Sequence, residues 1–181
     1  MLKASDCRFG RIKDCRWLDT TGPTDVARFK YGYDRASNRL WRQDTVATSQ
    51  SQAFDELYEY DGLYRLHEMG RGTLNTGHTA LTTTSFAQCF SLDETGNWMG
   101  FRTDNDGNGT WDLEQTRSAN QVNQITGLTP PTSPVGYRLY YDPAGNLDRW
   151  VARPEVTTVG SRSDRTIHTP CPTVFGGSFT Q

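Results

Sequence analysis

The chain has 181 residues, of which 34% are hydrophobic and 12% aromatic, and its formal net charge is −2. This apolar content is thin for one large core, whereas the many aromatic rings argue against a disordered polar tract and suit flat β-surfaces. The 19 basic and 21 acidic residues are interleaved, so no basic field indicates a nucleic acid partner, and no apolar run is long enough to span a membrane.

Hairpin-like units recur along the chain. The first occupies residues 33–40 and begins Tyr-Asp, and residues 60–66 repeat that start. Residues 92–98 keep the Asp and a Gly-Asn pair but begin with Leu, and residues 141–147 restore Tyr-Asp. A fifth, degenerate unit is expected at residues 120–125. The residues that define the repeated turn are Tyr33, Asp34, Tyr60, Asp61, Asp93, Gly96, Tyr141, Asp142 and Gly145.

Each unit is predicted to be an antiparallel β-hairpin. Large side chains alternate before the motif, at Phe29, Tyr31 and Tyr33, as expected for a strand with one packed face. The Asp begins a tight turn by accepting backbone N–H bonds, and a Gly or Asn then supplies a positive φ. Because a single hairpin is marginal in water, we expect the units to pair edge to edge in a sheet that continues beyond this chain.

The segments between the units are polar. Residues 47–53, 73–85 and 129–136 are predicted to be loops, and the best helix candidate, residues 115–124, has no convincing apolar stripe. We therefore divide the chain into β-hairpin repeats at 1–150 and an irregular, poorly ordered tail at 151–181. The four cysteines are scattered without a Cys-x-x-Cys pair, and we expect free, partly buried thiols.

The pattern Tyr-Asp-x-x-Gly-Asn/Arg-x-Leu of these units resembles the bacterial type of the YD-repeat, or Rhs (rearrangement hot spot), family, over roughly residues 8–150. The resemblance implies an all-β fold of antiparallel β-hairpin repeats with long polar loops, forming part of a spiralling sheet that builds a shell. It also implies an extracellular or cell-surface location, although the first ten residues lack the apolar run of a secretory signal. Four units cannot close a shell, so we expect a truncated segment of one.

An acidic loop is the one candidate ion site. Its oxygen-bearing residues follow the spacing of a calcium-binding loop, with Gly107 at the sixth position but Gln115 at the twelfth, where a bidentate Glu is expected. The alternative is a turn rich in Asp, Asn and Gly that closes a hairpin without any ion. The candidate calcium ligands are Asp104, Asp106, Asn108, Thr110 and Asp112.

The sequence therefore predicts a non-catalytic structural or binding scaffold, with no catalytic residue and with calcium as the only candidate cofactor. The expected partners are further YD repeats or another chain along exposed sheet edges, carbohydrate stacked on exposed rings, or an encapsulated polypeptide. One alternative is the repeat portion of a polymorphic-toxin delivery protein whose effector domain lies elsewhere. Another is a carbohydrate-active hydrolase that uses pairs of repeat aspartates, but their recurrence once per hairpin indicates a role in the turn.

Overall fold

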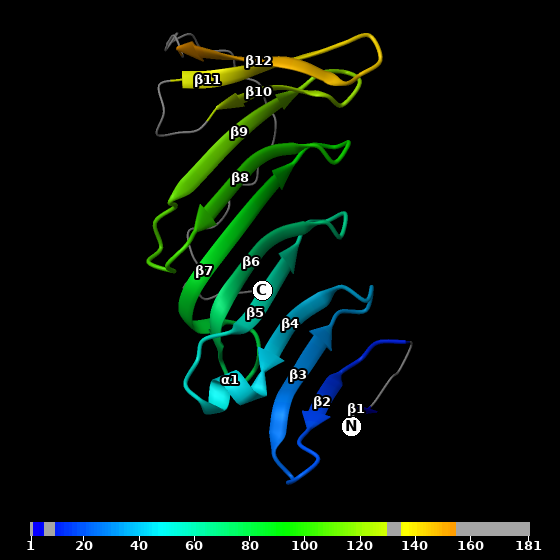
Figure 1. Ribbon diagram of the computed structural model, residues 1–181, viewed down its shortest axis with the longest axis vertical. Helices are drawn as coiled ribbons and strands as arrows, with labels where there is room; N and C mark the ends of the chain where they lie inside the picture. The colour runs from blue at the N-terminus through cyan, green and yellow to red at the C-terminus, as the bar shows by residue number, and fades with distance from the viewer. Residues whose placement is uncertain (1, 6–9, 130–134, 155–181) are drawn as a thin grey trace. The chain divides into compact units, whose positions relative to one another are not determined.

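The computed structural model describes residues 2–5, 10–129 and 135–154. Within these ranges the chain forms a 12-stranded antiparallel sheet whose strands follow one another in sequence order (Figure 1). One short helix, α1 (Thr45–Ser49), joins two strands, and no described helix is long and apolar enough to cross a membrane. The all-β fold expected from the sequence is thus confirmed. The strands are β1 (Leu2–Ser5), β2 (Asp14–Leu18), β3 (Asp25–Tyr33), β4 (Arg39–Asp44), β5 (Asp55–Tyr60), β6 (Leu66–Leu74), β7 (Leu81–Leu92), β8 (Trp98–Asp104), β9 (Leu113–Ala119), β10 (Ile125–Thr129), β11 (Val135–Tyr141) and β12 (Leu147–Pro154).

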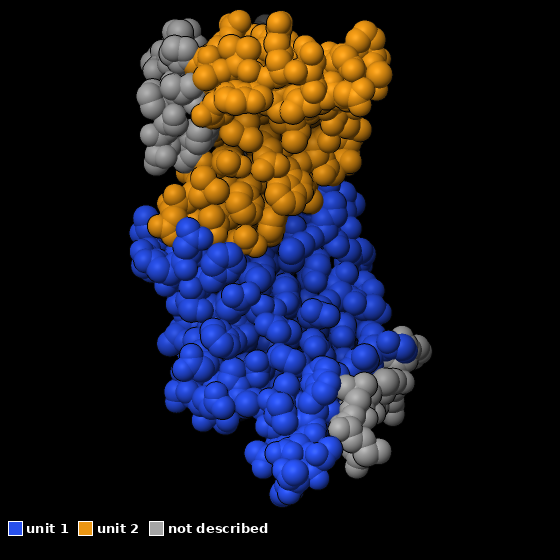
Figure 2. Space-filling model, viewed as in Figure 1, with its two compact units in different colours: residues 1–87, 104–110, 172–181 blue, residues 88–103, 111–171 orange. Residues whose placement is uncertain are grey.

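Two compact units divide these strands (Figure 2). The first unit takes the described residues of 1–87 and 104–110, and the second takes those of 88–103 and 111–154. The first therefore contains β1 to β6 and α1, the second contains β9 to β12, and β7 begins in the first unit and ends in the second.

A β-bulge accompanies each Tyr-Asp motif. The strand register shifts by one residue just before Tyr33 in the β3–β4 hairpin, before Tyr60 in β5–β6 and before Tyr141 in β11–β12. A bulge bends its strand and increases the local twist, so it re-aims the side chain beside it. The extra residue lies on the strand that leaves each turn, at Leu40, His67 and Asp148, opposite the strand that carries the tyrosine.

The apolar core of the first unit is small. Leu57, Leu74 and Leu81 are buried together, and Trp41 packs against them. Trp41 lies opposite Gly32 in the β3–β4 register, and a Cβ atom on Gly32 would lie only 2.0 Å from its indole nitrogen. The indole therefore crosses the space that a side chain at position 32 would fill, which is why a glycine stands in the middle of a strand.

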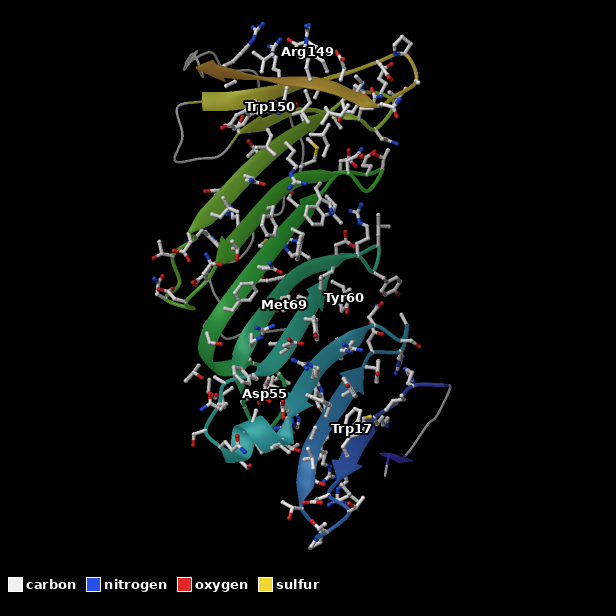
Figure 3. The ribbon with its side chains drawn as sticks, viewed as in Figure 1. Trp17, Asp55, Tyr60, Met69, Arg149 and Trp150 are labelled. Atoms are coloured by element: carbon white, nitrogen blue, oxygen red, sulfur yellow. The ribbon has the colours of Figure 1, made fainter. Side chains whose placement is uncertain are left out.

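A buried carboxylate holds α1 against the first unit. Asp55, beside α1 in Figure 3, accepts hydrogen bonds from the backbone N–H of Asp44 at 2.9 Å and of Leu74 at 3.2 Å, and from the Thr48 hydroxyl at 3.2 Å. Asp44 in turn caps the helix, because its carboxylate accepts the N–H of Ala47 at 3.0 Å. The helical turn at 45–49 overlaps residues 47–53, where the sequence predicted only a loop.

Other segments also differ from the sequence prediction. Residues 81–85, expected in a loop, begin β7, since a run of β-branched threonines suits a pleated strand. The helix candidate at 115–124 is β9 and the turn after it. β12 continues to Pro154, past the predicted end of the repeats at 150, while 155–181 and most of the predicted loop at 129–136 lie outside the described residues. Cys15 is a free thiol as expected, but Cys89 is buried and disulfide-bonded, so the prediction of free thiols was wrong for it.

Candidate functional site

The hairpin turns at the motifs share one backbone pattern. In the first, the N–H of Asp34 donates to the carbonyl of Asn38 at 3.0 Å, and the N–H of Ser37 donates back to the carbonyl of Asp34 at 3.3 Å. The same pair of bonds closes a turn that begins at Asn120, where the degenerate fifth unit was expected. The first, fourth and fifth residues of these turns are Asp34, Ser37 and Asn38; Asp61, Tyr64 and Arg65; Asp93, Gly96 and Asn97; Asn120, Asn123 and Gln124; and Asp142, Gly145 and Asn146.

The fourth turn residue always has a positive φ. The value is 92° at Gly96 and 86° at Gly145, where glycine adopts the left-handed region without steric cost. Three other turns place a residue with a Cβ atom there, with φ of 75° at Ser37, 62° at Tyr64 and 62° at Asn123. Since the side chain is costly in this region, the surrounding hydrogen bonds must hold these three turns in shape.

The repeat carboxylates brace the turns from within. Asp93 accepts the N–H of Thr95 at 2.9 Å and the N–H of Asn97 at 2.8 Å on one oxygen, and the Asn97 amide at 2.9 Å on the other. The hydrogen bond from the Asn97 side chain is the main cause that lowers the pKa of Asp93 to about 2. Asp142 has the same arrangement with Asn146, whose side-chain hydrogen bond lowers the pKa of that carboxyl group. Both groups are therefore ionised acceptors at neutral pH.

The motif tyrosines fasten each hairpin to the one before it. The hydroxyl of Tyr33 donates to the carbonyl of Ile12 at 3.0 Å, that of Tyr60 to the carbonyl of Arg39 at 2.9 Å, and that of Tyr141 to the carbonyl of Ile125 at 2.9 Å. Arg39 and Ile125 directly follow the preceding turns at 34–38 and 120–124, and Ile12 lies just before β2. One tyrosine per motif thus ties two neighbouring hairpins together at their turns.

The unit at 92–98 lacks the tyrosine but is connected in another way. The side-chain amide of Asn97 donates to the side-chain oxygen of Asn123 in the following turn at 2.9 Å. The Thr95 hydroxyl donates to the same oxygen at 3.3 Å. Successive turns of the second unit are therefore joined by side chains here, whereas elsewhere a tyrosine reaches back to the main chain.

The acidic loop lies between β8 and β9. Asp104 and Asp106 belong to the first unit, where their carboxylates could supply oxygen ligands to a cation, and Asp112 belongs to the second unit. Asp104 has no exposed surface and accepts the N–H groups of Gly107 at 2.7 Å and Gly109 at 2.8 Å. Burial alone would raise the pKa of Asp104, but these N–H donors outweigh it and lower the pKa.

The remaining predicted ligands lie in the same loop. Asn108 is exposed, its side-chain amide donates to Asp106 at 2.9 Å, and its side-chain oxygen accepts the N–H of Thr110 at 2.7 Å. Gly107 has a φ of 72°, and a Cβ atom there would lie 2.2 Å from the carbonyl oxygen of Thr84. The loop is joined to β-strands and not to helices, and its hydrogen bonds close it without an ion. Calcium binding by this loop stays a prediction.

A charge ladder across the first unit was not expected from the sequence. Glu56 is buried on β5 between two arginines: Nε of Arg42 donates to it at 2.8 Å and the guanidinium of Arg71 at 3.2 Å. Arg42 also lies over the ring of Phe29 at 5.3 Å, and Arg71 over that of Phe86 at 5.6 Å. The row runs phenylalanine, arginine, glutamate, arginine, phenylalanine across the sheet. Only the strand register shows it, because its members are dispersed along the chain.

Two carboxyl groups face each other across the β5–β6 hairpin. Glu59 pairs with Glu68 in the register, and Glu68 is only 2% exposed. Burial raises the pKa of Glu68 to about 7, with a further contribution from the charge of Glu59, and burial also raises the pKa of Glu59. A like-charged pair in a strand is destabilising when both members are ionised, so this pair favours a protonated Glu68.

Several aromatic rings, considered in the sequence as a surface for sugars, pack on each other. Trp17 meets Phe29 edge-on at 6.0 Å, and Tyr137 meets Trp150 at 5.5 Å. Trp150 keeps 63% of its surface exposed and leaves β12 on the face opposite Arg149 (Figure 3). The rings thus contribute to cross-strand packing, and carbohydrate binding by them stays a prediction.

Comparison with known proteins finds similarity among solved structures. No protein-family model and no curated protein sequence matches the chain. Among solved structures, a chain of the Photorhabdus luminescens Tc holotoxin pore is similar, with a TM-score of 0.40 and 14% identity. The similarity covers 77% of this chain and 9% of that one, so this chain spans about a tenth of the length of the solved chain.

Proposed function

We propose that the chain is a non-catalytic scaffold, a segment of a YD-repeat type β-sheet in which each hairpin is fastened to its neighbour. The observation that carries the proposal is the tyrosine hydroxyl bond, which recurs from Tyr33, Tyr60 and Tyr141 to the main chain of the preceding hairpin. A bond repeated in this way serves the stacking of units, since each unit gains stability from its neighbours.

The state of the repeat aspartates supports a structural role. A general acid or base works best with a pKa near the operating pH. The pKa of Asp93 is lowered to about 2 and that of Asp142 is lowered too, because their oxygens accept hydrogen bonds inside the turn. Such carboxylates are poor proton donors at neutral pH, which argues against the hydrolase alternative.

The scaffold is proposed to continue through pairing at its outer strands. Within the described part of the chain, β12 has a strand neighbour only on the β11 side. An outer strand offers backbone groups to a further strand. Further repeats, or another chain, would pair with this strand and extend the sheet, as part of a shell or of a cell-surface interaction protein. Enclosure of a delivered toxin and adhesion are two uses of such a scaffold, and neither needs a catalytic group here.

Native-state hydrogen exchange of the full chain tests the proposal. We expect Tyr141→Phe to increase exchange in β10 to β12 and to leave β3 to β6 unchanged, and Tyr60→Phe to do the reverse, because each hydroxyl couples only adjacent hairpins. Uniform loss of protection throughout the chain would contradict a stack of locally coupled units. Turnover in a glycoside screen that Asp93→Asn abolishes would instead support the hydrolase.

A further inference from the structure

A groove on one face of β9 to β12 is lined by small and basic residues. It has a volume of about 490 Å³ and lies wholly within the second unit. In the strand register, Ser118 pairs with Gly127, Gly127 with Arg138, and Gly136 with Arg153. Residues that pair directly, or that are two apart on one strand, project from the same face of a sheet. These residues therefore share one face of the second unit.

Two glycines line the groove on this face. Gly127 and Gly136 lie on adjacent strands and carry no side chain; Gly127 is half-buried and Gly136 is buried. The Ser118 side chain packs against Gly127: a Cβ atom on Gly127 would lie 2.6 Å from the Oγ of Ser118. Thr129 also lines the groove. The lining thus includes hydroxyl-bearing residues and glycines, together with Leu128 and Tyr137.

Two guanidinium groups stand at this hollow. Arg138 pairs directly with Val151, which makes Arg153 its diagonal neighbour on β12, with Cα atoms about 7 Å apart. Both arginines line the groove and both are largely exposed. Among the described residues neither forms an ion pair. Two like charges on neighbouring strands raise the local positive potential, which an anion shared between them would lower.

Among the described residues of β9, an acidic side chain on this face is engaged in an ion pair. Glu114 is four residues before Ser118 on β9, so both side chains project from the same face of the strand, and Glu114 forms an ion pair with Arg102 of β8. Arg149 shares the face with Arg138 and Arg153, but its guanidinium lies over the ring of Tyr140 at 4.7 Å. The groove thus keeps an excess of positive charge at the two arginines that line it.

We infer that this groove binds an oxyanion group, held between the guanidinium groups of Arg138 and Arg153. Arginine binds carboxylate, sulfate and phosphate by parallel N–H donors, and a second guanidinium neutralises a second oxygen. Gly127 has no side chain to obstruct the approach of the anion to the strand backbone. The inference is independent of the scaffold proposal, because it concerns one face of one unit and not the coupling between hairpins.

The test is an NMR titration of the full 181-residue chain with sodium sulfate or sodium acetate, at ionic strength held constant with sodium chloride. We expect saturable shifts at the amides of Gly127 and Gly136. Each of Arg138→Gln and Arg153→Gln should weaken binding about tenfold, the equivalent of one lost charge-assisted bond. Arg149→Gln, on the same strand as Arg153, removes the same charge and should change the affinity less than twofold.

The two salts distinguish the sources of the oxyanion. Tighter binding of sulfate supports a tetrahedral ligand such as a sulfate or phosphate group, and tighter binding of acetate supports a carboxylate. Equal weakening by Arg149→Gln would overturn the site, since the effect would then be one of net charge. Shifts that chloride alone reproduces would overturn it too. Unchanged far-UV circular dichroism spectra of the variants show that they remain folded.

Discussion

Replacement of Glu68 by Gln should remove a defined pH dependence from the stability of the chain. The pKa of this carboxyl group is raised from 4.5 to about 7 by burial and by the neighbouring Glu59. The folded chain therefore holds the proton more tightly than the unfolded chain does. The stabilisation by this group is complete below about pH 4.5 and is lost as the pH rises through about 7.

The magnitude follows from the size of the shift. A rise from 4.5 to about 7 corresponds to roughly 3 kcal/mol at 1.36 kcal/mol per pKa unit. Water that reaches the carboxyl group when the strands relax reduces this figure, so we expect about 2 kcal/mol. Since glutamine resembles the neutral acid, Glu68→Gln should be as stable as the parent near pH 5 and about 2 kcal/mol more stable near pH 8.

The assay is urea unfolding followed by far-UV circular dichroism between about pH 5 and pH 8. The difference between variant and parent isolates this group from the histidines, which titrate in both chains. Glu94→Gln, at an exposed turn position, is the matched control and should run parallel to the parent. If the parent and Glu68→Gln lose stability equally as the pH rises, the carboxyl group is not held protonated and the reasoning fails.

Four further substitutions have expected outcomes. Gly32→Ala should lower the free energy of unfolding by about 2 kcal/mol, because the indole of Trp41 occupies the space that the new methyl group would need. Gly62→Ala is the control: no atom lies within 4 Å of a Cβ there, so the free energy of unfolding should change by less than about 0.5 kcal/mol. Urea unfolding measures both. Glu56→Gln should cost about 2 kcal/mol in the same assay, because it removes the negative charge between Arg42 and Arg71 and turns one of the two acceptor oxygens into an NH2 donor. A cost below about 0.5 kcal/mol would mean that solvent screens these ion pairs. Tyr60→Phe should lower the free energy of unfolding by about 1 kcal/mol, because one hydrogen bond is lost. An unchanged free energy of unfolding would mean that this hydroxyl does not couple the two hairpins. Excess calcium should raise the melting temperature of the parent chain above its value in chelator, and Asp104→Ala should abolish this rise. If the parent melts at the same temperature in both conditions, the loop is a turn that binds no calcium.

The sequence was sufficient for the hairpins because their information is local. An Asp that can bond to the N–H groups of the next residues, followed by a residue that tolerates positive φ, defines a turn within five residues. The same locality located the turn at 120–125, even though Asn120 replaces the Asp and no tyrosine precedes it. The acidic loop was found for the same reason, since its carboxylates lie within nine residues.

Features that depend on strand register could not be predicted from the sequence. Glu56 meets Arg42 and Arg71 only because β4, β5 and β6 pair in one alignment, and a shift by one residue would place these side chains on opposite faces. The helix α1 depends on Asp55, which follows it in the chain and receives its bonds from three separate segments. Alternation within a single segment cannot show either arrangement.

The link between neighbouring turns is more constant than the residues that make it. Where the motif keeps its tyrosine, the hydroxyl reaches back to the previous hairpin, as from Tyr141 to Ile125. Where leucine replaces the tyrosine, Asn97 reaches forward to Asn123 instead. Selection for the tyrosine as such would not explain the second arrangement, whereas a need to couple adjacent turns explains both. Asn97→Ala should therefore behave like Tyr60→Phe in hydrogen exchange, with loss of protection confined to the hairpins on either side of the broken link.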